Sequence, residues 1–262
     1  MSNHTRGQDL PPADDGDAFA VQFHLLGSVP FDDFLKLQRR LVYDAGGQLD
    51  GRITVLLCEH PQGITVGRLG SRGHVRLSGE QLRARRLDVR WVGRGGGCLL
   101  HGPGQIAVYP IVPLEWHGWS VGEYLDRLQQ ALRDMCDQLA VRHERRDRQP
   151  GIWGRSGQLA CCGIAVRRWI TCHGAYINVN PMMTHYSFVD VVDPLSAPRG
   201  QKTTMGSLFA ERRRAMTIPK VRATLIPHLA AAFGTERYHL VTGHPLLKVN
   251  RRTRIDARNR AS

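Results

Sequence analysis

The residues best suited to chemistry gather in the stretch GRGGGCLLHGPGQIAVYP, which spans residues 93–110. Closely spaced glycines surround Arg94 and His101, and an apolar run typical of a β-strand follows. Glycine lets a backbone approach a ligand closely or adopt positive φ, at an entropic cost that another interaction must offset. A tight turn would account for residues 93–97 but not for the HGPGQ sequence at 101–105. The surroundings of this stretch therefore decide what it does.

Histidines and cysteines are the other reactive side chains. His101 and His173 are each followed by glycine at the end of an apolar run, where a sheet would bring distant segments together. The pair could line one pocket, although a histidine in such a position is more often a structural hydrogen-bonding residue. The cysteines lie in or beside apolar segments without the paired C-x-x-C spacing of a zinc site, so buried thiols and no metal are expected. They are Cys58, Cys98, Cys136, Cys161, Cys162 and Cys172.

Nucleotide and hydrolase motifs are missing from the sequence. The GRGGGCLL segment is not closed by the Gly-Lys-Ser/Thr of a Walker loop, and GRLGSRG at residues 67–73 is too loose for a dinucleotide fingerprint. A Gly-x-Ser-x-Gly nucleophile elbow does not occur, which argues against an α/β-hydrolase. No cofactor is expected.

The composition fits a globular α/β protein of one larger domain or two small ones, with 262 residues that are 42% hydrophobic. The net charge of +13 favours an acidic partner, while a solvated basic surface explains it equally well. The basic residues are scattered without aromatic interleaving, which disfavours nucleic-acid binding. Neither a secretory signal nor an apolar run of about 18 residues is present, so the protein is expected in the cytoplasm, away from membranes.

Apolar spacing predicts strands and helices between a polar leader, residues 1–17, and a basic tail, residues 243–262. One domain is expected over residues 18–242. A first helix is predicted from Phe31 to Val42, with Asp32 and Asp33 in its first turn. Strands are predicted at residues 20–26, 53–58, 63–66, 88–92 and 106–112.

A second helix is predicted after Ser120, which forms a capping-box pattern with Glu123 ahead of an apolar stripe. A third lies between Thr217, as its N-cap, and Gly234. Residues 151–180 contain short apolar runs broken by a glycine turn, which predicts antiparallel hairpins. The predicted fold class is therefore α/β, with a mixed, largely antiparallel sheet and packed helices.

Four segments follow the order and approximate spacing of one known family, and together they are more specific than any single glycine motif. They are LCEHPQGITVGR (57–68), RGGGCLLHGPGQIAVYPI (94–111), GIWGRSGQLACCGIAVRRWITCHGAYINVN (151–180) and KTTM (202–205). Over roughly residues 20–235 the chain resembles the lipoyl(octanoyl) transferase family.

The resemblance implies a fold shared with biotin and lipoate protein ligases, with a pocket for a C8 acyl chain. It implies octanoyl transfer from acyl carrier protein to a lysine on the lipoyl domain of 2-oxoacid dehydrogenases or on the glycine cleavage H protein. Burial of the chain would contribute about 0.8 kcal/mol per methylene. By the same resemblance the acyl-binding residues are Arg94, Gly95, Gly96, Gly97, Cys98, Leu99, Leu100, His101, Cys161, Cys162, Gly163, Gly174, Ala175 and Tyr176.

The chain departs from the family pattern at the positions that carry catalysis. The family lysine that assists proton transfer corresponds to Gln158, and the family cysteine that forms an acyl thioester corresponds to Leu195. Glutamine cannot titrate and leucine cannot attack. The expected pocket rim is also more apolar, because Gly97, Leu99 and Leu100 replace glutamine, threonine and tyrosine of the family pattern.

Three explanations of these departures stay open. Transfer could be direct, without a covalent intermediate on the protein. The protein could instead bind a medium-chain acyl group or a lipoyl domain without catalysing transfer. Finally, the nucleophile could have moved to Cys98, Cys161, Cys162 or Cys172, provided that a nearby cation or histidine lowers the pKa of the thiol.

Overall fold

The computed structural model describes residues 20–48, 50–146, 149–191 and 203–247. The predicted leader, most of the predicted basic tail and Leu195 lie outside the described residues.

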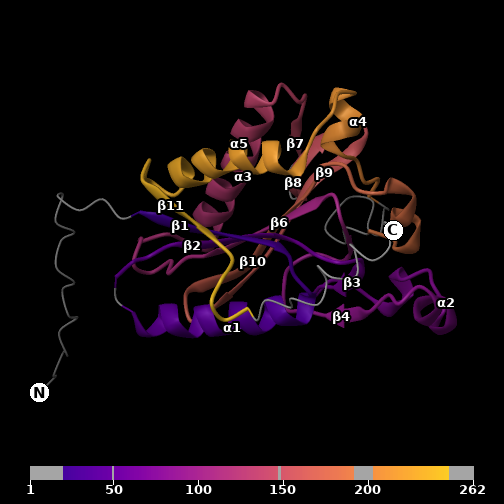
Figure 1. Cartoon of the computed structure of the whole chain (residues 1–262), viewed down its shortest axis with the longest axis horizontal. Coiled ribbons are helices and arrows are strands. Elements are labelled where there is room, and N and C mark those ends of the chain that lie inside the picture. Colours follow the sequence, from indigo (N-terminus) through magenta and orange to yellow (C-terminus); the bar gives the residue numbers. More distant parts are fainter. Residues whose placement is uncertain (1–19, 49, 147–148, 192–202, 248–262) are drawn as a thin grey trace, which may run out of the picture.

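An eight-stranded mixed sheet forms the centre of the fold (Figure 1). Strands β11, β1 and β2 run parallel, and the remaining neighbours in the sheet pair antiparallel. The predicted mixed, largely antiparallel sheet is thereby confirmed. In spatial order the strands are β11 (Tyr238–Thr242), β1 (Val21–Ser28), β2 (Thr54–Glu59), β6 (Gln105–Ile111), β10 (Ile170–Asn178), β9 (Gly157–Arg167), β8 (Gln149–Gly154) and β7 (Glu144–Arg146).

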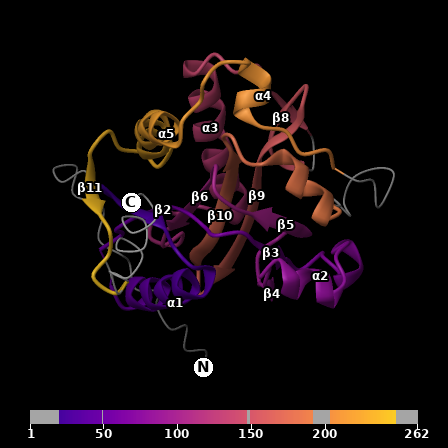
Figure 2. The same ribbon diagram turned by 45° about the vertical axis from the view of Figure 1, so that its right-hand side comes forward.

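A second sheet of three strands lies beside the first (Figure 2). In it β3 (Gly63–Val66) pairs parallel with β4 (Val89–Trp91) and antiparallel with β5 (Cys98–His101). Helix α2 (Gly79–Ala84) packs Leu82 into the apolar cluster of this sheet, and Ser78 with Gln81 forms its capping box. Strands β3 and β4 were predicted from the sequence, whereas β5 and α2 were not.

Helices cover both faces of the large sheet (Figure 1). Helix α1 (Phe31–Gly47) lies on one face, and its buried Phe34 and Leu37 belong to a core cluster with β2, β6 and β10. Helices α3 (Val121–Gln138) and α5 (Ile218–Ala232) share the opposite core cluster. Among the described helices, none has both the length and the apolar character needed to cross a membrane.

The predicted starts of α3 and α5 are confirmed, and their capping groups are in place. Ser120 accepts from the Glu123 amide while the Glu123 carboxylate accepts from the Ser120 amide, which completes the capping box of α3. Thr217 caps α5, and Gly234 follows its end with φ of 88°. Helix α1 runs to Gly47, five residues beyond the predicted end. Short helices α4 (Leu208–Arg212), η1 (Arg72–His74) and η2 (Met183–Phe188) complete the described elements.

The glycine turn predicted within residues 151–180 is confirmed as the β8–β9 hairpin, in which Gly154 pairs with Gly157. Gly174, in β10, allows close approach of the neighbouring strand. A Cβ there would overlap the Val108 carbonyl oxygen and lie 2.8 Å from Pro110 Cδ. The glycine at position 174 is therefore required for pairing of β10 with β6.

We expect Gly174→Ala to lower the free energy of unfolding by about 1–3 kcal/mol, because backbone atoms of β6 must move to admit the methyl group. Urea denaturation monitored by circular dichroism measures the change. The matched control is Gly47→Ala at the end of α1, where a Cβ meets nothing within 4 Å and stability should stay level or rise slightly. Equal stability of the two variants would contradict the packing role of Gly174.

Candidate functional site

The glycine-rich loop between β4 and β5 is held from both sheets. Amides of Gly67, Arg68 and Leu69 donate to loop carbonyls at 3.1, 3.0 and 3.1 Å, and the Gly95 amide donates to Ile164 of β9 at 2.9 Å. Gly163 permits this contact, because a Cβ there would lie 2.9 Å from the Gly95 oxygen. The loop therefore joins the small sheet to the large one.

Arg94 carries its guanidinium from this loop into the interior, where the residue is 1% exposed. Nη1 donates to the Gly95 oxygen at 2.9 Å, and Nη2 donates to the carbonyl and hydroxyl oxygens of Thr65 at 3.2 and 2.8 Å. The Tyr176 ring lies 5.9 Å away, within cation–π range. Arg94 Nε has no partner, and no carboxylate pairs with Arg94 among the described residues.

A buried cation that is solvated only by neutral groups is costly, since desolvation of a charge is offset fully only by an opposite charge. A negatively charged group that binds at the glycine-rich loop would therefore be stabilised by Arg94.

A chain of hydrogen bonds runs from Arg94 through Thr65 to His101. The Thr65 hydroxyl lies 2.7 Å from His101 Nε2, and His101 Nδ1 lies 2.9 Å from Gln105 Oε1. Because Gln105 Nε2 donates to the Leu100 oxygen, Oε1 is the acceptor, so His101 Nδ1 carries the proton and Nε2 accepts from Thr65. Burial lowers the pKa of His101 well below its usual value, and the imidazole is neutral.

The network continues into the segment after β10. Gln105 Nε2 and the Tyr186 hydroxyl both donate to Asn178 Oδ1, at 3.0 and 2.6 Å. Asn178 Nδ2 in turn donates to the Gly206 carbonyl at 3.0 Å. These hydrogen bonds therefore hold together β6, β10, η2 and the segment that contains Gly206.

His60 and Tyr109 form a second buried pair that sequence analysis missed. His60 Nδ1 donates to the Val29 oxygen at 2.7 Å, so Nε2 accepts from the Tyr109 hydroxyl at 2.7 Å. Phe34 stacks on Tyr109 with ring centroids 3.8 Å apart. His60 lies in the first quoted segment, LCEHPQGITVGR, but the sequence gives no sign of its contact with β6.

The structure brings some of the predicted acyl-binding residues together. Arg94 Cδ lies 3.2 Å from the position of a Gly163 Cβ, and the rings of His101 and Tyr176 are 4.7 Å apart. Cys161 Sγ lies 4.0 Å from the backbone carbonyl oxygen of Tyr176. Leu99 belongs to the same α1-side cluster as Cys161 and Tyr176, and Gly95, Gly96 and Gly97 form the loop above it.

Other predicted residues point elsewhere, because side chains alternate between the faces of a strand. Cys98 and Leu100 lie in the cluster of the small sheet. Ala175 lies in the cluster beneath α3 and α5, and the partly buried Cys162 packs against it. The acyl-binding role of all these residues stays a prediction.

The candidate thiols are not activated. Burial raises the pKa of Cys161 to about 11, despite the nearby Arg94 charge. Burial likewise raises the pKa values of Cys98, Cys162 and Cys172. At neutral pH these groups are thiols rather than nucleophilic thiolates.

Gln158, at the position of the family lysine, is 7% exposed near the start of β9. Its backbone amide donates to Thr204, and its carbonyl accepts from Gly206 at 3.0 Å. This part of the KTTM segment therefore lies beside β9, as an isolated bridge from Gln158 to Met205 also shows. Lys202 lies outside the described residues.

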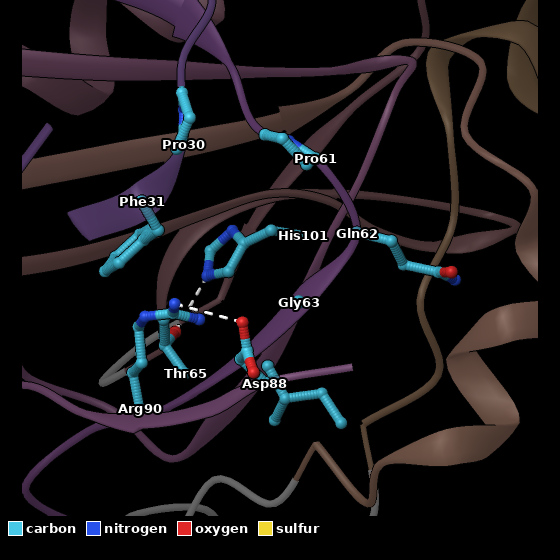
Figure 3. Close-up of a pocket in the computed structure, with 10 residues that line it drawn as sticks. Pro30, Phe31, Pro61, Gln62, Gly63, Thr65, Asp88, Arg90 and His101 are labelled. Carbon is cyan, nitrogen blue, oxygen red and sulfur yellow. Dashed lines mark hydrogen bonds and ion pairs between the residues drawn. The ribbon is translucent and has the colours of Figure 1, made fainter. Parts of the chain in front are cut away.

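His101 and His173 line different pockets. A pocket of about 90 Å³ reaches His101 and Thr65 from the side of Phe31 (Figure 3). Arg90 at its edge is already paired with Asp32 and Asp88. His173 lines a larger pocket on another side of the glycine-rich loop.

The fold is that of lipoate protein ligases. A solved structure of lipoate-protein ligase A bound with ATP matches with a TM-score of 0.68 and 12% identity, covering 87% of this chain and 91% of that chain. The family model for the lipoyl protein ligase A/B catalytic domain matches residues 32–230. The chain belongs to this family, and the predicted family membership is confirmed.

Relatives in this family carry the name octanoyltransferase. The protein from Roseiflexus sp. (strain RS-1) is 33% identical over 221 residues, which are 83% of this chain and 89% of the relative. The Porphyromonas gingivalis protein is 32% identical over 174 residues, 63% of this chain. That from Syntrophobacter fumaroxidans is 36% identical over 137 residues, 52% of this chain. The matches span only 35% and 60% of the latter two relatives.

The buried histidines predict a loss of stability on acidification. Burial lowers the pKa of His60 to about 4. Burial and the charges of Arg94 and Arg167 lower the pKa of His173 to about 3. In the unfolded chain the pKa of a histidine is about 6.5. Below that pH the unfolded chain binds more protons, so the free energy of unfolding falls as the pH drops towards about 4. Each histidine contributes about 1.4 kcal/mol per pH unit.

Urea denaturation between about pH 7 and pH 5 measures this slope. His60→Gln should reduce this slope by the contribution of one histidine, whereas Arg40→Gln, at an exposed position on α1, should leave the slope unchanged. Identical slopes for the unmodified chain and His60→Gln would overturn the prediction.

Proposed function

We propose that this protein transfers an octanoyl group from acyl carrier protein to a lysine of a lipoyl domain. Membership of a family with octanoyltransferase relatives supports the proposal. The observation that carries it is the buried, uncompensated guanidinium of Arg94 beneath the glycine-rich loop. We assign the activity to a single domain over residues 18–242, within which the family match lies.

The acyl carbonyl is the group that suits this cation. When the acceptor amine attacks the thioester carbon, negative charge develops on the carbonyl oxygen, and a fixed donor in a dry site stabilises it more than the ground state. A C–N bond forms and the C–S bond breaks. The proton released by the amine goes to the departing thiolate of the carrier, so the step balances without a further reactant.

The surroundings of Arg94 provide walls for the acyl chain. Leu99, Cys161 and Tyr176 are apolar or aromatic neighbours on the α1 side. The remaining predicted residues would support the loop rather than contact the chain.

Direct transfer is the route that the side chains favour. All six cysteines have pKa values raised by burial, and Gln158 cannot accept a proton. Acyl binding without transfer is the second candidate, because the same Gln158 replaces a titratable group of the family pattern.

We expect a lipoyl domain incubated with octanoyl acyl carrier protein and this chain to gain one octanoyl group, measured by intact mass. Arg94→Gln should reduce the transfer rate by about 100-fold, since it removes the charge that stabilises the oxyanion. The control is Arg40→Gln, an exposed position on α1 that pairs with Asp44. No octanoyl gain above the enzyme-free sample, with octanoate still bound in calorimetry, would leave the binding-only function.

A second experiment addresses the route. Transfer should persist when Cys98, Cys161, Cys162 and Cys172 are each changed to alanine, and mass spectrometry should find no acyl-protein intermediate. In the Leu195→Cys variant alone, the new thiol should be acylated poorly, because its pKa stays at about 8.5. Only Leu195→Cys with Gln158→Lys should accumulate an octanoyl thioester. Loss of transfer in one folded cysteine variant would show that the nucleophile has moved there.

A further inference from the structure

A pocket of about 310 Å³ lies between α1, the end of β4 and the β9–β10 hairpin. Gly93, the residue directly before Arg94, forms part of its wall. Its volume is at the lower end of the range of about 300–1,000 Å³ that small-molecule sites occupy. This pocket therefore has room for a ligand next to the glycine-rich loop.

Three arginines from three different segments surround this pocket. Arg39 comes from α1, Arg68 follows β3, and Arg167 lies at the end of β9. In the part of the chain that the structure describes, none of the three is in a salt bridge. Like charges around one hollow repel each other, and a bound anion relieves the repulsion. By contrast, Arg90 at the smaller pocket is already neutralised by two aspartates.

His173 lines the same pocket. The residue is 5% exposed, and its Nδ1 has no hydrogen-bond partner. The backbone has φ of 58° and is held by the bond from the His173 amide to Gln38 Oε1 at 2.6 Å. A ligand in the pocket lies against the His173 ring, whose Nδ1 is left without a hydrogen bond by the protein itself.

The lining also contains the polar Gln38 and several apolar side chains. The apolar members include Leu35, Val42, Val92 and Val166. An occupant that satisfies the whole pocket has an anionic head and a less polar chain that extends inward.

We propose that this pocket receives the phosphate-bearing arm through which an acyl carrier presents its thioester. The phosphodiester lies among Arg39, Arg68 and Arg167, and the arm passes His173 and Gly93 to bring the thioester to Arg94. Guanidinium forks match phosphate oxygens in geometry as well as charge. The inference rests on the proposed octanoyl transfer. A free medium-chain carboxylate has a similar head and tail, and the test separates the two sources.

The test measures binding to the full chain by calorimetry with three probes: pantetheine 4′-phosphate, pantetheine and octanoate. We expect the phosphate probe to bind at least about tenfold more tightly than pantetheine. Arg39→Gln with Arg167→Gln should weaken it at least about tenfold, whereas the matched Arg40→Gln should stay within about twofold. NMR of the His173 imidazole, assigned with His173→Gln, should shift on binding of the phosphate probe.

Equal affinity for pantetheine and its phosphate, or no effect of the double arginine variant, would overturn the proposal. Arginine-dependent binding of octanoate without binding of the phosphate probe would also overturn it and identify the pocket as a carboxylate site.

The transfer assay separates this inference from the proposed function. If transfer occurs, the double arginine variant should raise KM for the carrier-bound donor at least about tenfold and leave kcat unchanged. Transfer with an unchanged donor KM would refute the pocket assignment alone. Arginine-dependent binding of the phosphate probe in the absence of transfer would refute the proposed function alone.

Discussion

The guanidinium of Arg94 lies between the two sheets among neutral oxygens and one aromatic ring, and the site is organised around its charge. Thr65 accepts from Arg94 and in turn donates to His101, so the cation fixes the direction of the hydrogen bonds that follow. The same charge and the same burial hold His101 and His173 neutral. The histidines therefore orient neighbouring groups, while the fixed charge comes from Arg94.

This division of roles agrees with the departures from the family pattern. A site that stabilises charge on an oxygen needs a rigid donor more than a titrating one. Gln158 has its amide and carbonyl in backbone hydrogen bonds to Thr204 and Gly206, so the peptide at this position is fixed even though its side chain cannot carry a proton. In the proposed function, the fixed charge of Arg94 acts in place of acid–base chemistry.

Local patterns determined which elements could be predicted from the sequence. Strand β3 was found at its observed boundaries, and α3 was found because Ser120 and Glu123 mark its start. Strand β11 was missed because most of Tyr238–Thr242 is exposed and no apolar alternation marks it. Strand β5 was hidden by the glycines that precede it, although all four of its residues are buried.

The site was predictable only in part for a similar reason. The resemblance placed Arg94, His101 and Tyr176 in one site, and the structure brings them into contact. It could not show that Cys98 and Ala175 face other clusters, since that depends on strand register. The pairing of His60 with Tyr109 joins residues 49 positions apart and leaves no local signal.

The attachment of the glycine-rich loop to both sheets also bears on kinetics. Lifting the loop breaks the hydrogen bonds donated by the amides of Gly67, Arg68 and Leu69 and the hydrogen bond from the Gly95 amide to the Ile164 carbonyl. Such an opening is a local unfolding event, far slower than side-chain motion. In the proposed function, the residence time of an acyl chain beneath the loop is therefore set by the rate of backbone opening. The exception is an acyl chain that slides out lengthwise without opening the loop.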